Sequence, residues 1–155
     1  MNNSKTNHLA VVVSAVVYFV IGGLWFGAIF SQAWLSAVGK SMEELQRTTM
    51  PAGALYTLAF IAALILSYTL NWLLQRGGKQ SANEGIKLAL GLWIGIVATT
   101  AGPIFMFSGA SLRLFLLDTG YPLLAMIITG AIIGGWRKKS ASQPQPVAKA
   151  SASGA

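Results

Sequence analysis

The sequence predicts an all-α polytopic membrane protein, four transmembrane helices in a bundle. Two observations carry this prediction. The 155-residue chain is 54% hydrophobic and only 10% charged, whereas soluble domains carry about 25% charged residues. Its apolar residues also gather in four runs, each longer than the ~20 residues that a helix needs to cross ~30 Å of hydrocarbon. Helices are expected because an open strand would leave backbone groups unpaired in lipid.

The four predicted spans lie at about residues 9–30, 52–74, 86–107 and 112–135. They form a transmembrane domain over residues 9–136, with a long loop at 31–51. Residues 1–8 are a polar stub, and residues 137–155 are a basic tail rich in Ser, Ala and Pro, which we expect to be disordered. The first span is too long for the apolar core of a signal peptide, so we expect it to be retained.

The distribution of Lys and Arg predicts the orientation. With four spans, both termini and the second loop share one side of the membrane. The other side carries three basic residues, Lys40, Arg47 and Arg113, which leaves eight of the eleven for the first side. The positive-inside rule therefore predicts that both termini are cytoplasmic.

The long outer loop contains a helix-start signal. Ser41 and Glu44 have the spacing of a capping box, so we expect a short helix over Met42–Thr48. Pro51 suits the first turn of the second span, because the fixed backbone angle of proline fits that position.

Glycine pairs four residues apart occur in three of the spans. This spacing lets two helix backbones approach closely in a membrane. The pairs pack helices within one chain, or they form the interface of a homo-oligomer, which we expect. They are Gly23 and Gly27, Gly91 and Gly95, and Gly130 and Gly134.

Two of these pairs belong to similar pentapeptides. Gly23-Leu24-Trp25-Phe26-Gly27 in the first span resembles Gly91-Leu92-Trp93-Ile94-Gly95 in the third. Both spans are predicted to run in the same direction, which is consistent with a two-plus-two parallel repeat. Such similarities also arise by chance in apolar helices, so both explanations stay open.

The inventory of reactive residues argues against an enzyme. The chain has no cysteine and one histidine, His8, and its acids are Glu43, Glu44, Glu84 and Asp118. General acid–base and nucleophilic catalysis need His, Cys or paired carboxylates. We therefore expect no catalytic residue, no metal site and no cofactor. The net charge of +7 is spread between apolar runs, so nucleic-acid binding is not expected.

Asp118 is the acid that falls inside a predicted span. At 1.5 Å per residue it lies ~27 Å from Trp136, near the outer interface. An ionisable residue at membrane depth is by default a functional hypothesis. The alternative is a structural role, in which Asp118 caps a turn or pairs with Arg113.

Two prolines are expected to distort the outer halves of the last two spans. Pro103 frees the carbonyl of Thr99, and Pro122 frees the carbonyl of Asp118. The fourth span is therefore predicted to be kinked, or broken at residues 118–120. A helix break with a charge is one style of binding site, but kinks without function are also common.

Aromatic residues gather at the same outer end. They form an interfacial belt, or an aromatic box for a lipophilic cation beside Asp118. The residues are Trp25, Phe26, Phe30, Trp34, Tyr56, Phe105, Phe107, Phe115 and Tyr121.

The run from Gly22 to Gly39, GGLWFGAIFSQAWLSAVG, resembles the signature G-x-x-W-[YF]-x-x-x-[LF]-[FS]-x-x-W-x-x-x-x-G of a family of small bacterial membrane proteins, domain of unknown function 1761. The segments 117–121 and 130–136 are similar to its closing helix. The resemblance covers residues 9–136 and implies four spans in the inner membrane of a bacterium, with no established substrate, cofactor or catalytic residue. Many members have Trp-Tyr-Ser where this chain has Trp-Phe-Gly, so any role of that phenol is in doubt here.

Once catalysis and nucleic-acid binding are set aside, the sequence supports two functions for this integral membrane protein. The first is binding or transport of a small molecule or cation through the outer half of the bundle. Its candidate residues are Asp118, Arg113, Tyr121, Trp25 and Trp34. The alternative is a non-transporting assembly or accessory protein that acts through its glycine faces. The lipid bilayer and further copies of the chain are the expected partners, and a small-molecule ligand remains unidentified.

Overall fold

The computed structural model describes residues 6–48, 50–78 and 80–136. Within these ranges it is all-α, without strands, and holds four helical stretches long and apolar enough to cross a membrane: His8–Ile29, Ala52–Arg76, Ala82–Ser108 and Leu112–Gly135. This confirms the predicted fold class. Residues 1–5 of the predicted stub and the whole predicted tail, 137–155, lie outside the described residues.

The elements follow one another along the chain with short connections. In order they are α1 (His8–Leu24), the π-helical segment η1 (Trp25–Ile29), α2 (Ser31–Val38), α3 (Met42–Thr48), α4 (Ala52–Arg76), α5 (Ala82–Leu92), the π-helical segment η2 (Trp93–Ala98), α6 (Thr99–Ser108) and α7 (Leu112–Gly135). The first and third spans each change from an α-helix to a π-helix at a tryptophan. Single-turn π-helical insertions are rare in proteins, and those that occur often lie at functional sites.

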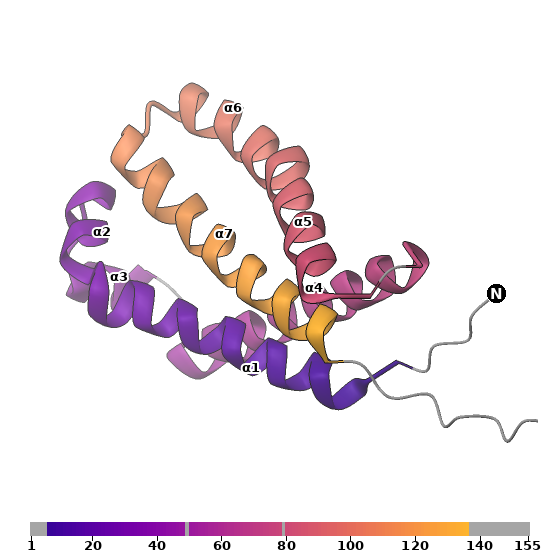
Figure 1. Ribbon diagram of the computed structural model, residues 1–155. Helices are drawn as coiled ribbons and strands as arrows, with labels where there is room; N and C mark the ends of the chain where they lie inside the picture. The colour runs from indigo at the N-terminus through magenta and orange to yellow at the C-terminus, as the bar shows by residue number, and fades with distance from the viewer. Residues whose placement is uncertain (1–5, 49, 79, 137–155) are drawn as a thin grey trace, which may run out of the picture.

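Helix α7 is the centre of the bundle. It packs against α1, α4 and α5, and in Figure 1 it runs between α1 on one side and the α5–α6 span on the other. We call the end that carries α2, α3 and the α6–α7 connection the loop end. The opposite end, where α1 begins and α7 finishes, is the terminal end.

The third span is the least enclosed of the four. In its most apolar window 6% of the residues are buried, against 39% for the fourth span. Its contacts with the rest of the chain are mainly those of α5 with α7. The third span therefore lies at the edge of the bundle, with most of its apolar surface left to lipid.

Glycines allow α5 and α7 to touch backbone to backbone. A Cβ atom at Gly85 would overlap the carbonyl of Gly130, and one at Gly130 would lie 2.8 Å from the Gly85 carbonyl carbon. A Cβ at Gly134 would overlap the carbonyl of Ser81. Packing rather than water exclusion holds membrane helices together, so this close approach is a main contact of the bundle.

Helix α7 is continuous from Leu112 to Gly135 with Pro122 inside it. The alternative of a break at residues 118–120 is therefore wrong. The proline removes one backbone hydrogen bond, that of the Asp118 carbonyl, and a membrane helix packed among other spans can continue past such a position. Indole N–H groups of two other spans bond the carbonyls on either side of Asp118. Trp25 donates to the Leu117 carbonyl at 3.1 Å, and Trp93 donates to the Thr119 carbonyl at 2.9 Å.

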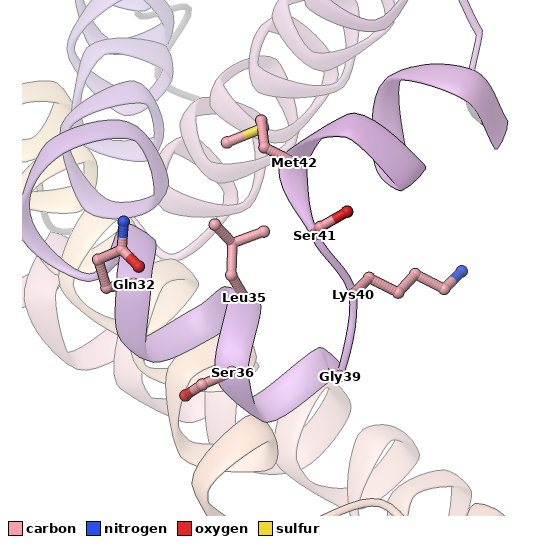
Figure 2. Close-up of a pocket in the computed structure, with 7 residues that line it drawn as sticks. All are labelled: Gln32, Leu35, Ser36, Gly39, Lys40, Ser41 and Met42. Atoms are coloured by element: carbon pink, nitrogen blue, oxygen red, sulfur yellow. The ribbon is translucent and has the colours of Figure 1, made fainter.

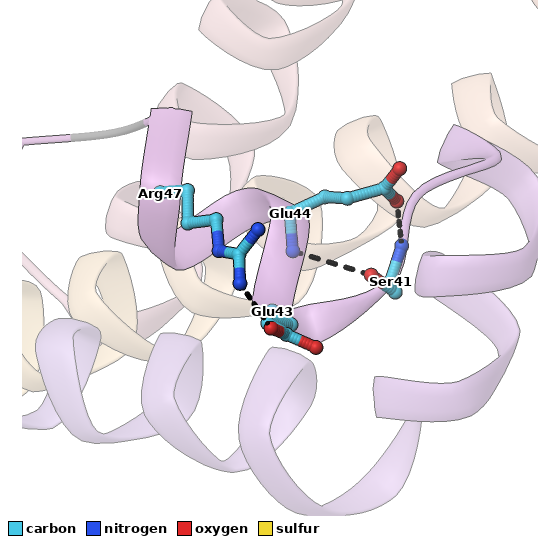
Figure 3. Close-up of polar contacts among 4 residues, drawn as sticks. All are labelled: Ser41, Glu43, Glu44 and Arg47. Atoms are coloured by element: carbon cyan, nitrogen blue, oxygen red, sulfur yellow. Dashed lines mark hydrogen bonds and ion pairs between the residues drawn. The ribbon is translucent and has the colours of Figure 1, made fainter.

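The predicted capping box and short helix are confirmed. The backbone N–H of Ser41 donates to the Glu44 carboxylate at 2.8 Å, and the backbone N–H of Glu44 donates to the Ser41 hydroxyl at 3.2 Å (Figure 3). An ion pair between Arg47 and Glu43 spans the next turn at 2.6 Å. Pro51 differs by one position from the expectation, because it is the residue that caps α4.

We expect α3 to loosen at low pH. The hydrogen bonds from Ser41 hold the pKa of the Glu44 carboxyl below its usual range. A lowered pKa in the folded state means that the stabilisation is complete above the ordinary glutamate pKa of about 4.3 and is lost as the pH falls through the lowered value. Hydrogen-exchange protection factors of the α3 amides should fall in that range. Glu44→Gln, which cannot titrate, should show no such step, and a wild-type α3 equally protected throughout would contradict the expectation.

Candidate functional site

A cavity of about 770 Å³ opens at the loop end between α1, α3, α4 and α7. Its lining is mostly apolar and aromatic. The lining residues are Phe19, Gly22, Gly23, Phe26, Gly27, Trp34, Met42, Leu45, Gln46, Met50, Pro51, Ala52, Leu55, Tyr56, Ala59, Asp118 and Tyr121. Pockets for small molecules occupy about 300–1,000 Å³, so the cavity has the volume of a ligand site.

Asp118 is the charged residue among those lining residues. Its Oδ1 accepts a hydrogen bond of 2.9 Å from the indole N–H of Trp34. Helix α2 brings Trp34 over α7, because the chain turns between η1 and α2 at Phe30. The carboxylate is therefore oriented on one side by an indole and faces the cavity on the other.

The structure does not pair Asp118 with Arg113. The ion pairs found in the described part of the chain are Arg47–Glu43 and Lys87–Glu84. On a helix, residues three or four apart share a face, whereas Arg113 and Asp118 are five apart and point in different directions. The alternative in which Asp118 pairs with Arg113 is therefore wrong, and Arg113 lies outside the cavity lining.

The two similar pentapeptides occupy corresponding places around Asp118. Trp25 begins η1 and Trp93 begins η2, and their indoles bond the α7 carbonyls on either side of the Asp118 residue. Pro122 leaves the Asp118 carbonyl itself without its helical donor. Together the two tryptophans hold the turn that presents the carboxylate.

Aromatic rings form the wall beside Asp118. Phe26 lies 5.6 Å from Trp34 and 5.5 Å from Tyr121 between ring centroids, both edge to face. Tyr18 packs behind Tyr121 at 5.3 Å. Gly22 makes room for this arrangement, because a Cβ there would lie 3.0 Å from the Tyr121 hydroxyl oxygen.

The residues singled out from the sequence lie in several parts of the bundle. Asp118, Trp34 and Tyr121 meet in the cavity, and Trp25 braces α7 beside it. Gly23 and Gly27 line the cavity, whereas Gly91 and Gly95 lie on the third span. A Cβ atom at any of these four glycines would meet nothing within 4 Å. Gly130 and Gly134 pack against α5 and its start, and Pro103 and Pro122 lie inside continuous helices.

Sequence reasoning missed the contribution of α3 to the cavity. Met42, Leu45 and Gln46 come from this short helix and cover the cavity on its loop side. A signal was present, because Met42 and Leu45 are three residues apart and so share a helix face. The partner of that face is far away in sequence and could not be identified.

A second hollow, of about 550 Å³, lies at the turn between α2 and α3. Figure 2 shows its seven lining residues, with the Lys40 side chain pointing outward. Six of the seven are exposed and Leu35 is half-buried. The hollow has neither an acid nor an aromatic ring, so the Asp118 cavity is the better candidate site.

Four helices that are long and apolar enough to cross a membrane define a helical polytopic membrane protein. The model of the protein family of unknown function DUF1761 matches residues 9–134, and the chain belongs to that family. This confirms the family resemblance, which rested on the Gly22–Gly39 run. No curated protein and no solved structure matches the chain.

Proposed function

We propose that this protein binds a small organic cation in the loop-end cavity, with the Asp118 carboxylate as its counter-charge. One observation carries the proposal: a carboxylate lines an apolar cavity in which no Lys, Arg or His side chain is found among the described lining residues. An ionised carboxylate in an apolar cavity attracts positive charge more strongly than one in bulk water, because less solvent screens it.

The aromatic wall supports a cation over other ligands. Phe26, Trp34 and Tyr121 line the same cavity as the carboxylate, and the faces of aromatic rings attract cations within about 6 Å. The lining also offers bulk apolar surface from α1, α3 and α4. A ligand with one positive charge and apolar substituents matches both features.

The charge distribution supports an orientation for this site. The Lys and Arg bias of the sequence favours cytoplasmic termini in a bacterial inner membrane, which places the loop end and its cavity toward the outside. Transport across the membrane would use the same site as its outward-facing step. We propose binding without catalysis, because the sequence contains no cysteine and its one histidine, His8, lies at the terminal end.

The test compares two ions of one shape and opposite charge. Tetraphenylphosphonium and tetraphenylborate are titrated into the purified protein in neutral detergent, with tryptophan fluorescence as the signal because Trp34 adjoins the carboxylate. We expect saturable binding of the cation and at least tenfold weaker binding of the anion. Equal binding of both ions would overturn the proposal.

Self-association is a second candidate function, favoured by the open glycines of the third span. Gly91 and Gly95 have space in front of them and lie on the least enclosed helix. Such a pair allows a second helix to approach closely. The homo-oligomer predicted from the sequence would then form along this edge.

We expect Gly91→Leu to reduce the oligomer without affecting the cation site. The leucine side chain would hold a second helix away from the glycine face. Light scattering coupled to size-exclusion chromatography in detergent measures the mass of the complex. A wild-type protein that is monomeric throughout, or a variant with an unchanged mass, would reject self-association through this face.

A further inference from the structure

Three buried hydroxyl groups lie between α1, α4 and α7. They belong to Ser14 on α1, Ser67 on α4 and Thr129 on α7, and each residue is fully buried, at 0% exposure. None of the three oxygens has a hydrogen-bond partner within the described chain. We call these residues the hydroxyl layer.

Contacts between α1 and α7 place Ser14 and Thr129 at the same height. The two helices are antiparallel, and the Asn7 side chain donates to the Trp136 carbonyl at 3.4 Å. Ser14 lies seven residues after Asn7, and Thr129 lies seven residues before Trp136. Because both helices rise 1.5 Å per residue, the two hydroxyls are level.

A contact between α1 and α4 places Ser67 at that height as well. The Gln75 side chain donates to the Thr6 hydroxyl at 3.4 Å. Ser14 lies eight residues after Thr6, and Ser67 lies eight residues before Gln75. All three helices contact one another, so the hydroxyl layer is one level of a shared three-helix interface.

Several threonine hydroxyls in the described part of the chain bond to their own helix. Thr69 donates to the carbonyl of Ile65 at 2.8 Å, and Thr119 donates to that of Phe115 at 2.6 Å. Thr57, Thr99 and Thr100 do the same. This is how a hydroxyl is satisfied where water is scarce, and it makes the three unpartnered groups of the hydroxyl layer an exception.

We propose that the hydroxyl layer binds one internal water molecule that bridges α1, α4 and α7. Buried waters typically make about three hydrogen bonds to polar groups that lack other partners, and the layer supplies three such groups. A neutral ligand fits better than a cation. Helices α1 and α4 contain no acid, and the acid on α7, Asp118, is eleven residues or ~16 Å from Thr129.

This site is independent of the proposed cation site. It lies on the terminal side of the cavity, two turns beyond Tyr121 along α7. The bridging water ties together three of the helices that form the cavity walls. It thereby satisfies three buried polar groups that have no partner in the described chain.

The test uses Thr129→Val, which keeps the shape of the side chain and removes its hydroxyl. A bridging water would lose one of its bonds, so we expect the thermal midpoint in detergent to fall by about 3 °C or more. Ser14→Ala should also lower it, and the double variant should lose less than the two single losses combined, because both act on one water. Thr69→Val, whose hydroxyl bonds its own helix and is exposed, is the matched control and should leave the midpoint unchanged.

A rise of the thermal midpoint in Thr129→Val would overturn the inference. If the layer were dry, Thr129→Val would remove an unsatisfied group and raise the midpoint. If it bound sodium, the wild-type midpoint would be higher in sodium chloride than in choline chloride, and Thr129→Val would abolish that difference. A Thr129→Val protein too unstable to measure would leave Ser14→Ala as the deciding variant, with the same signs.

Discussion

Replacing Gly130 with alanine is expected to destabilise the protein strongly. The added Cβ would lie 2.8 Å from the Gly85 carbonyl carbon and 3.2 Å from the Ala89 Cβ. Helix backbone cannot move aside as a flexible side chain can, so α5 and α7 would have to separate. Overpacking a core costs about 1–3 kcal/mol, and a contact with backbone lies at or above the upper end. Thermal unfolding in detergent should show a drop of several degrees.

Gly53→Ala is the matched control for this change, because both glycines lie inside helices. A Cβ at Gly53 meets nothing within 4 Å, and alanine is favoured over glycine in a helix by about 0.5–1 kcal/mol. Its midpoint should equal or exceed that of the wild type. A Gly130→Ala protein as stable as Gly53→Ala would show that α5 and α7 are not packed backbone to backbone.

Replacing Asp118 with asparagine is expected to weaken tetraphenylphosphonium binding at least tenfold, or by about 1.4 kcal/mol. Asparagine keeps an oxygen that accepts the Trp34 hydrogen bond, so the change removes charge while preserving shape. Two unit charges ~4 Å apart attract by about 4 kcal/mol at an effective dielectric constant of ~20. Desolvation of the carboxylate offsets part of this attraction, which is why the expected loss is smaller.

Glu84→Gln makes the same change of charge at the other end of the bundle. Glu84 forms an ion pair with Lys87 at 2.9 Å near the start of α5, far from the cavity lining. Its variant should bind the cation as the wild type does. Equal affinity of Asp118→Asn and Glu84→Gln would mean that Asp118 is not the counter-charge.

Local patterns predicted most of the fold. The four apolar runs located the spans because length and hydropathy decide whether a helix crosses a bilayer. Ser41 and Glu44 located α3, because both partners of a capping box lie within one turn. Each of these features depends on residues that are near one another in sequence.

Features that depend on distant partners were not predictable in this way. The three GxxxG pairs look alike in sequence, yet Gly130 packs against Gly85 whereas Gly91 faces open space. The partners of Trp25 and Trp93 are carbonyls 92 and 26 residues away. The change to π-helix at these tryptophans leaves hydropathy unaltered, so no apolar pattern marks it.

The candidate site was therefore only partly foreseen. Asp118 was identified because a charge inside an apolar span is costly and so informative. Its hydrogen bond to Trp34 and the position of α3 over the cavity arise from tertiary packing. Arg113 was assigned from proximity in sequence, and the helical angle between the two residues separates them.

Protection of a single cysteine tests most directly whether a cation occupies the cavity. The chain has no cysteine, and Gly23 lines the cavity with space for a side chain. A Gly23→Cys protein reacts with a membrane-impermeant thiol reagent with and without tetraphenylphosphonium, beside Ser36→Cys, which lies in the second hollow. We predict that the cation slows labelling of Gly23→Cys at least tenfold and leaves Ser36→Cys unchanged. Equal labelling of Gly23→Cys under both conditions would contradict binding in this cavity.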